Sequence, residues 1–576
     1  MWKLCVGLVI LTLPQMASAQ VAPESLLPAK SQLYFHFEGM EKHKKNYEKT
    51  AFAKMMAGDM GTFFNGLFDY VGKQMKDNLK DEINPEQAQL VRDHAFGMFK
   101  NLAQHGVVFG AEVRSVQPLD MQATLVFPNG AGDKKSLVSL INLAPKFDKK
   151  TEIKELKQGG KTIRYTQAEE VYLMWWSEGK HAVLTVSSHS PEKLLARMKE
   201  EKGKFMMGKF YNQVKQFDEF PSWCYGYVDL RSITVMLNEF NLDIGKVIDQ
   251  IGLSSASGIT FNEGFSGPAQ RSVFQIHLDG QRKGIFRLAN KKSFTLADLP
   301  PMPDDLTAFA ASNINLGEVY NVTMEMVESI VAIASPNDVG QATQAIQGFE
   351  QASGISLQKD LFAHMGDLVV GYAAWPEGIL GTGQITLIKT KDADKLEKTL
   401  VDINRFAQNQ FAGIVELKEA KYRGVTIYSL HSPIAGTGAV SWAVHKGWLA
   451  VAAYPQPIKG FILRTKGDLP SWKVAPAVKE HFENMPNKIT GITYHDPRPS
   501  MKVILSVTPL LMAYGNVAIA ELGKLDPNAK TPEPFDLQLI PNAYEATQHL
   551  FPNVTVSTDQ GNVIRIEARV SIGLPF

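Results

Sequence analysis

Hydrophobic and polar residues alternate along several stretches of the chain, a pattern typical of half-buried β-strands. These stretches are 107–113, 122–127, 163–166, 171–176 and 182–187. Breaks such as Pro128-Asn129-Gly130 and Gly159-Gly160 separate them, and glycine-containing breaks of this kind are typical of hairpin turns. The pattern therefore predicts a mainly antiparallel sheet.

Helical spacing marks other segments. Over 392–409, four apolar residues fall on one face of a helix: Leu396, Leu400, Ile403 and Phe406. The charged segment 134–143 is its counterpart earlier in the chain. Segments 84–87 (Asn-Pro-Glu-Gln) and 335–338 (Ser-Pro-Asn-Asp) combine a capping residue with an early proline, as helix starts do. Sheets with packed helices indicate the α+β class.

One short pattern, an apolar residue and proline followed by a strand, occurs four times. Its prolines are Pro28, Pro221, Pro300 and Pro486. Pro300 follows Pro28, and Pro486 follows Pro221, at a distance of about 270 residues. Elements between them recur in the same order; for example, 160–165 (GKTIRY) resembles 424–428 (GVTIY). We therefore predict a tandem duplication in which each copy holds a long and a short module.

The predicted domains follow from this repeat. They are a signal peptide (1–19), a long module (20–218) and a short module (219–298), then a second long module (299–483) and a second short module (484–576). Each short module is predicted to contain a strand, one helix (232–252; 502–523) and closing strands (273–278 and 284–288; 554–557 and 563–574).

The first residues have the layout of a secretory signal peptide. Lys3 precedes a short apolar run over 4–14, and Ala17-Ser18-Ala19 forms a cleavage site, so the mature chain is expected to start at Gln20. The apolar run is too short to span a bilayer. We expect an extracytoplasmic protein, either periplasmic or secreted.

Composition narrows the class of protein. Of 576 residues, 44% are hydrophobic and 21% charged, which excludes a disordered chain, and the net charge of +1 gives no attraction for nucleic acid. Cleavage would remove Cys5 and leave Cys224, which we interpret as a buried small hydrophobe. No later segment has 18 uninterrupted apolar residues, so no transmembrane helix is expected.

Motifs of catalysis and metal binding are missing from the sequence. It contains no G-x-S-x-G, and the serine-rich segments 252–258 and 264–267 are interpreted as polar loops. It contains no H-E-x-x-H or C-x-x-C, and structural roles are expected for the dispersed histidines, among them His36, His105, His364 and His495. The glycines of 378–383 lie between two predicted strands and indicate a hairpin turn, not a phosphate loop.

Other residue groups have equally plain interpretations. The adjacent acids Glu169-Glu170 and Asp304-Asp305 are expected to be solvated. Trp175, Trp176, Trp442 and Trp448 are expected to pack in cores, with an aromatic platform for carbohydrate or peptide as the alternative. Alternating apolar residues from Ile564 to Phe576 are typical of the last strand of outer-membrane proteins, but also of a half-buried closing strand, which we favour. We therefore predict no catalytic residue, cofactor or metal.

The chain resembles a family of exported bacterial proteins. The features are the signal peptide, the L-P-x-x-x-x-L-Y pattern, the segment 50–56 (TAFAKMM) and the strand 366–373 (GDLVVGYA). Together they resemble the DUF3352-type proteins of unknown function found in planctomycete-like bacteria. The resemblance implies bacterial export and transfers no catalytic residues.

Taken together, the sequence favours a non-catalytic structural or binding protein outside the cytoplasm, with a protein or cell-envelope partner and no nucleic acid. An exported hydrolase with an unrecognised site is the first alternative, and an outer-membrane-associated protein is the second.

Overall fold

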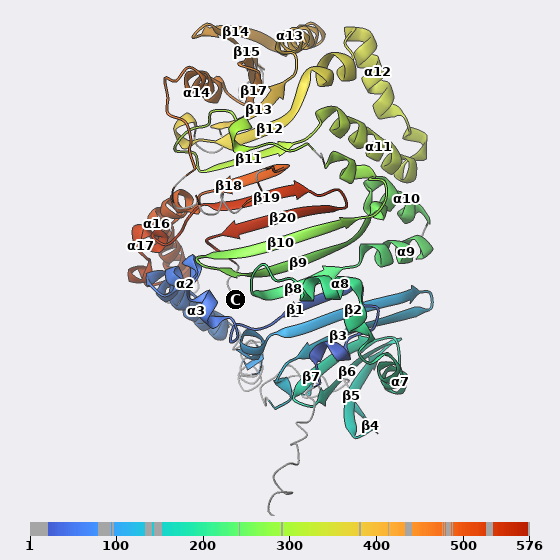
Figure 1. Ribbon diagram of the computed structural model, residues 1–576. Coiled ribbons are helices and arrows are strands. Elements are labelled where there is room, and N and C mark those ends of the chain that lie inside the picture. The colour runs from blue at the N-terminus through green and yellow to red at the C-terminus, as the bar shows by residue number, and fades with distance from the viewer. Residues whose placement is uncertain are drawn as a thin grey trace, which may run out of the picture. The chain divides into compact units, whose positions relative to one another are not determined.

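The computed structural model describes residues 21–573 except for 79–93, 95–96, 99, 133–140, 143–151, 241, 290–291, 379–381, 413, 432–439, 475, 477–478, 480–484, 487 and 526–533. Contacts divide the chain into two compact units. The first contains residues up to 45 and 78–236, and the second contains 46–77 and 237–575. Within the described residues, twenty strands pair with their neighbours in antiparallel fashion, and helices lie between them along the chain (Figure 1). The predicted α+β class is confirmed.

Strands of the first unit pair in the order β4-β5-β6-β7-β3-β2-β1-β8. Their bounds are β1 Leu33–Phe37, β2 Val107–Val116, β3 Leu119–Phe127, β4 Lys154–Gln158, β5 Lys161–Ala168, β6 Val171–Glu178, β7 His181–Ser187 and β8 Ser222–Val228. The helices are η1 Pro23–Leu26, η3 Gly130–Gly132, α7 Pro191–Glu201, η4 Lys204–Met207 and α8 Lys209–Lys215. Helices α1 Lys44–Tyr47 and α9 Leu230–Phe240 contain boundaries between the units.

Alternation along these strands produces the core of the first unit. Tyr34, Val108, Met174 and Val183 point to the same buried cluster, and Leu194 of α7 packs into it with no exposed surface. Helix α7 begins with Pro191 in its first turn, where a proline leaves no helical hydrogen bond unmade. An apolar side chain of this size contributes about 1.5–3 kcal/mol when fully buried.

Strands of the second unit pair in the order β9-β10-β20-β19-β18-β11-β12-β13-β17-β16-β15-β14. Their bounds are β9 Ala256–Ser266, β10 Ala269–Leu278, β11 Ala308–Asn313, β12 Met365–Ala373, β13 Gln384–Thr390, β14 Glu416–Tyr422, β15 Val425–His431, β16 Val440–His445, β17 Trp448–Ala452, β18 Gly491–His495, β19 Asn553–Asp559 and β20 Val563–Val570.

Helices of the second unit occur between these strands. The α-helices are α2 Ala51–Met56, α3 Asp59–Asn78, α10 Leu242–Ile251, α11 Leu316–Ala334, α12 Gln341–Ser353, α13 Ala393–Gln410, α14 Pro455–Thr465, α16 Pro497–Leu525 and α17 Ala543–Thr547. Short turns of helix are η5 Leu253–Ser255, η6 Gly284–Leu288, η7 Leu296–Asp298, η8 Pro336–Asp338, η9 Leu357–Leu361, η10 Phe362–His364, η11 Trp375–Glu377 and η12 Leu537–Leu539.

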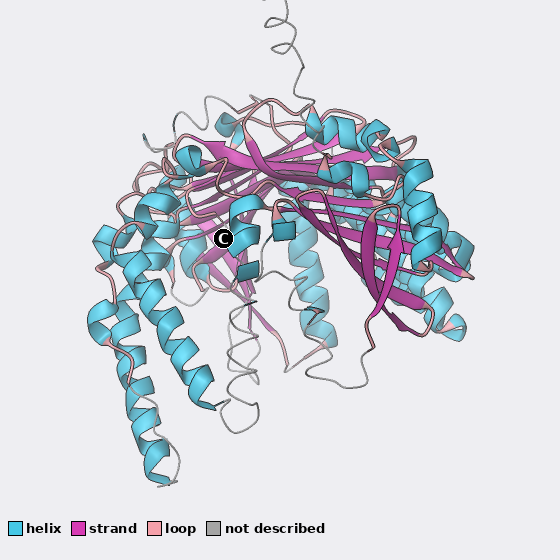
Figure 2. Ribbon diagram, turned by 90° about the horizontal axis from the view of Figure 1, so that it is seen from below, coloured by secondary structure: helices cyan, strands magenta, loops and turns pink. Residues whose placement is uncertain are grey.

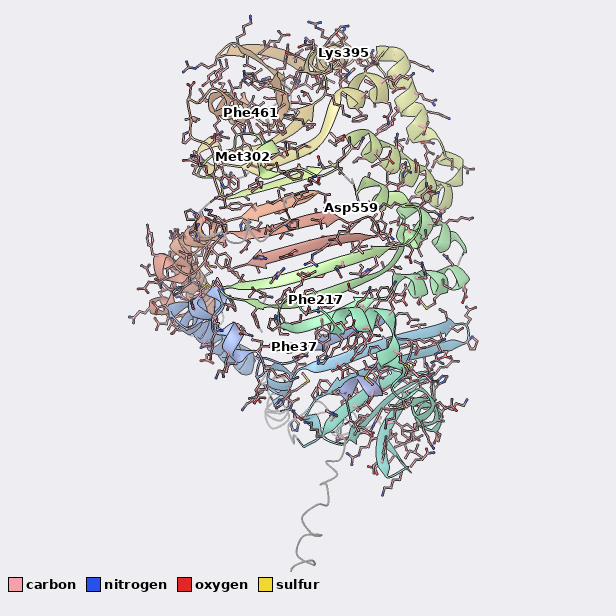
Figure 3. The ribbon with its side chains drawn as sticks, in the orientation of Figure 1. Phe37, Phe217, Met302, Lys395, Phe461 and Asp559 are labelled. Carbon is pink, nitrogen blue, oxygen red and sulfur yellow. The ribbon has the colours of Figure 1, made fainter. Side chains whose placement is uncertain are left out.

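The largest core lies in the second unit. Phe461 of α14 is fully buried against the sheet and Met302 is 2% exposed; both are labelled in Figure 3. On the side where Figure 1 places α3, α16 and α17, long helices extend beyond the strands in the view of Figure 2.

The order of β11 to β18 repeats that of β1 to β8 strand for strand. The turns repeat as well: Gly159–Gly160 joins β4 to β5, and Arg423–Gly424 joins β14 to β15, all four with positive φ. Two successive positive φ values define the type I′ hairpin turn, and glycine adopts them without steric strain. The module boundaries drawn from the sequence remain predictions.

Most predicted strands lie within observed ones, but three expectations are wrong. Segment 284–288 forms η6, not a strand, because Gly284 has φ of +48° and the Phe286 amide donates back to the Lys283 carbonyl at 3.1 Å. The two segments expected to be polar loops contain the ends of β9, at 256–258 and 264–266, while 253–255 form η5. The single predicted helix over 232–252 is the two helices α9 and α10. In contrast, α13 starts as predicted, with Asp392 capping the Lys395 amide.

Candidate functional site

A pocket of about 420 Å³ lies at one edge of the first unit. It is bounded by η1, by the end of β1, and by residues just before β2, after β3 and before β7. Phe37, labelled in Figure 3, is the last residue of β1 and marks this edge. The lining residues are Pro23, Glu24, His36, Glu38, Glu41, Lys42, Gln104, His105, Pro128, Asn129, Lys180, His181 and Lys215.

His36 is the centre of the polar network. The pleat of β1 turns Tyr34 and His36 to the same buried side, and the strand register places Tyr225 of β8 directly opposite His36. Nδ1 of His36 lies 2.9 Å from Tyr225 Oη, 3.2 Å from Glu24 Oε1 and 3.3 Å from Tyr34 Oη. Only 7% of His36 is exposed, so these contacts hold the ring in one orientation.

Glu24 reaches His36 from η1. Burial alone would raise the pKa of this carboxyl group, but the hydrogen bond and charge of His36 outweigh burial and hold the pKa below its ordinary value. Glu24 therefore stays ionised near neutral pH and contacts the imidazole ring of His36 as a carboxylate.

Glu38, just after β1, is the second carboxylate of this polar network. Its carboxylate lies 3.2 Å from His43 Nε2 and accepts a 3.2 Å hydrogen bond from Tyr225 Oη. Burial raises its pKa, while the His43 hydrogen bond and the charges of Lys42, His36 and Lys215 lower it to about 2. Lys215 donates a 2.8 Å hydrogen bond to Tyr225 Oη. The same hydroxyl group contacts both His36 and Glu38, so Tyr225 connects the two carboxylates of the network.

Two basic residues where β7 begins, Lys180 and His181, have fewer partners. Nε2 of His181 lies 2.9 Å from the Val21 carbonyl, but its buried Nδ1 has no hydrogen-bond partner among the described residues. Burial is the main reason why the pKa of His181 is lowered. Lys180, its neighbour, is exposed and forms no ion pair within the described part of the chain. His105, in contrast, lies 3.2 Å from Glu41.

The second unit has a pocket at the matching edge of its repeated strands. It measures about 500 Å³ and is bounded by the ends of β11 and β13 and the starts of β12 and β17. Its chemistry differs: Lys389 Nζ lies 4.8 Å from the ring centre of Trp448, and Asp367 pairs with Lys292. No histidine is among the described residues that line it, so the two pockets differ in their chemistry.

The residues singled out from the sequence are scattered. Cys224 is buried, and Trp175, Trp176, Trp442 and Trp448 are at most 5% exposed, as expected of core residues. Glu169-Glu170 and Asp304-Asp305 are exposed. No three His, Cys, Asp or Glu side chains form a metal-binding group among the described residues. Ala17, Ala19 and Gln20 lie outside the described residues, as do 84–87 and most of 134–143.

Sequence reasoning missed the pocket because its polar residues come from distant segments. The sequence predicts an ordinary structural role for His36 and gives no separate signal for Glu24 or Tyr225. The available signal was the run Tyr34-Phe35-His36-Phe37-Glu38, in which a histidine occupies an inward-facing strand position beside a carboxylate.

Comparisons with known proteins assign no family to the chain. No family model matches it, and no curated protein matches it. Among solved structures, crystal forms I and III of TP0453 each cover 48% of this chain at 10% sequence identity, with TM-scores of 0.22 and 0.23, and span 89% and 90% of TP0453. Crystal form IV covers 45% of this chain and 82% of TP0453, with a TM-score of 0.22 and 10% identity.

Proposed function

We propose that this chain is a non-catalytic binding protein that works outside the cytoplasm and holds a small anionic ligand in the pocket of its first unit. The apolar run 4–14 and the Ala17-Ser18-Ala19 site support export. The resemblance to exported DUF3352-type proteins supports the same location.

The observation that carries the binding role is the arrangement of charge in the pocket. Each acidic side chain, Glu24, Glu38 and Glu41, lies 3.2 Å from a histidine and is thus already paired. Lys180 also lies at the pocket and forms no ion pair within the described part of the chain. An anionic ligand would pair with this ammonium group, whereas the carboxylates of the pocket already have histidine partners.

A binding role also agrees with the residue types present. No serine, threonine or cysteine is among the described residues that line the pocket, so the usual nucleophiles of acyl transfer are missing there. Three lysines and three histidines against three carboxylates favour a carboxylate or phosphate group over a cation.

The test uses the exported, mature chain and a panel of small carboxylates, phosphates, sugars and amines in a thermal-shift assay followed by calorimetry. We expect binding of an anionic class, weakened at least tenfold in Lys180→Ala. Lys157→Ala, an exposed lysine of β4 outside the pocket, is the matched control. Failure of every anionic compound to bind, or equal binding by all variants, would overturn the proposal.

An exported hydrolase is the second candidate, and the Glu24–His36 pair favours it. A carboxylate at 3.2 Å from Nδ1 orients an imidazole in the way that a general base needs. This candidate predicts turnover of an ester, amide or glycoside that is lost in His36→Asn while circular dichroism stays unchanged. Binding without turnover would exclude it for the compounds tested.

A further inference from the structure

Helix α16 of the second unit exposes apolar side chains to an unusual extent. From Val503 to Ala520 none of its residues is charged. The part of α16 from Pro497 to Ala518 is 22 residues long and has a mean hydropathy of 1.3, yet only 6% of this apolar segment is buried. By length and composition alone this helix could cross a membrane, so the expectation that no such helix exists remains a prediction. A core helix of a soluble protein would be mostly buried.

The exposed side chains form one continuous stripe. Val503, Val507, Leu510, Tyr514 and Val517 recur three or four residues apart and are 42–68% exposed. Ile504 and Leu511, at 61% and 65%, widen the stripe. Contiguous exposed apolar area of this kind indicates a surface that binds another apolar phase.

The other side of α16 is fixed to the protein. Leu505 is only 7% exposed and belongs to the large core, and Met501 and Met512 pack against that core. Asn516 accepts a hydrogen bond from the Phe535 amide at 2.9 Å and donates one to the Phe535 carbonyl at 3.1 Å. Since one side of α16 packs against the protein, only the opposite side, which carries the stripe, can contact another molecule or surface.

We infer that the α16 stripe docks on the interfacial region of a lipid bilayer, with the helix lying along the membrane surface. Hydroxyl groups near the stripe are already satisfied within the helix, as a lipid surrounding requires: Ser506 Oγ donates to the Val503 carbonyl at 2.8 Å, and Thr508 Oγ1 to the Ile504 carbonyl at 2.7 Å. The inference does not depend on the pocket of the first unit.

Residues around the stripe also fit a membrane interface. At the start of the uncharged run, Lys502 Nζ lies 4.6 Å from the ring centre of Tyr544, which is 72% exposed on α17. Tyrosine and lysine are the residues that sit at the level of lipid headgroups. Phe68 of α3, a helix that extends on the same side in Figure 1, is 71% exposed and adds apolar surface.

A second copy of the chain is the competing occupant, and the helix is poorly suited to it. A coiled-coil partner is normally selected by charged residues that flank the apolar seam, and the whole run 503–520 lacks charge. Pro509 lies in the middle of the helix, where a proline is tolerated better in membrane helices than in coiled coils.

The test is flotation of the purified full mature chain with vesicles of phosphatidylcholine alone and of phosphatidylcholine with phosphatidylglycerol. We expect the chain to float with vesicles, and the double variant L511E/Y514E to lose at least nine-tenths of this binding. Phe411→Glu, at a 55% exposed apolar site outside α16, is the matched control and should float like the natural chain. Unchanged thermal midpoints would show that all variants fold.

Three results would overturn the inference. The first is that the natural chain remains unbound with both kinds of vesicle. The second is equal loss of flotation in Phe411→Glu and L511E/Y514E. The third is a concentration-dependent dimer, seen by analytical ultracentrifugation, that L511E/Y514E abolishes while no flotation occurs, since the stripe would then belong to a second copy.

Discussion

The buried pair of Glu377 and Arg464 gives the sharpest stability prediction. Arg464 Nη2 lies 2.5 Å from Glu377 Oε1, and the two side chains are only 6% and 9% exposed. Gly460 makes this approach feasible, because a Cβ atom there would meet Glu377 Oε1 at 2.0 Å. Helix α14 therefore lies directly against the carboxylate.

Two opposing effects decide what the pair contributes. At an effective dielectric constant of about 20, unit charges at this separation attract by about 7 kcal/mol. Removing each ion from water costs several kcal/mol, about the same in total. The pKa of Glu377 shows which effect is larger: burial raises it, and the adjacent Arg464 does not bring it back to its ordinary value. Arg464 Nε and Nη1 also have no hydrogen-bond acceptor in the described part of the chain.

We therefore expect the single and double substitutions to behave very differently. Arg464→Met and Glu377→Leu should each lower the free energy of unfolding by about 3–5 kcal/mol, because each leaves one buried charge unpaired. The double variant, which leaves neither, should be within about 1 kcal/mol of the natural chain or more stable. Urea unfolding at pH 7, followed by circular dichroism, measures all four proteins.

The double variant decides the matter. If it lost as much stability as the two single variants together, the coupling energy between the two side chains would be zero, and each would stabilise the fold on its own. The reasoning from the raised pKa of Glu377 would then be refuted.

Three further predictions concern other parts of the chain. Glu38 has a pKa of about 2 against an ordinary 4.5, so its contribution, about 1–2 kcal/mol after allowance for solvent screening, is complete above pH 4.5 and lost as the pH falls toward 2. Urea unfolding across this range should show a smaller pH dependence in Glu38→Gln, and parallel curves would contradict this. Gly252→Ala should lower the free energy of unfolding by more than about 1–3 kcal/mol, because φ is +97° and the new Cβ would lie 2.1 Å from the Lys283 carbonyl oxygen. Gly280→Ala, at φ +72° with open space around it, should lower it by only about 1 kcal/mol. Equal midpoints of thermal unfolding in the two variants would refute the steric reason. Mass spectrometry of the chain exported from a bacterial host should give Gln20 as the first residue, and an intact N-terminus would contradict the signal-peptide prediction.

Local patterns predicted those parts of the fold whose cause is local. The alternation in 122–127 and 182–187 reports one buried face, and β3 and β7 contain these segments. The edge strand β4 gave no such signal, because its five residues are all polar or charged except Leu156 and mostly exposed. Its position depends on pairing with β5, which no short window contains.

The pocket was not predictable for a similar reason. Its network joins η1 to β1 and β8, and Tyr225 lies 189 residues from His36 along the chain. Only the register of β1 with β8 brings these two side chains together. A histidine on a strand is compatible with many roles until its cross-strand neighbour is known.

The place of β20 has a consequence for how the chain folds. β20 pairs with β19 on one edge and with β10 on the other, and Arg271 and Glu567, bonded at 2.9 Å across this pairing, are 296 residues apart. During synthesis or export, the hairpin of β9 and β10 emerges long before its partner, and one edge of β10 stays open in the meantime. Contacts of such long range slow folding, and an open strand edge invites pairing with other chains. We therefore expect the second unit to be prone to self-association until β20 has paired with β10.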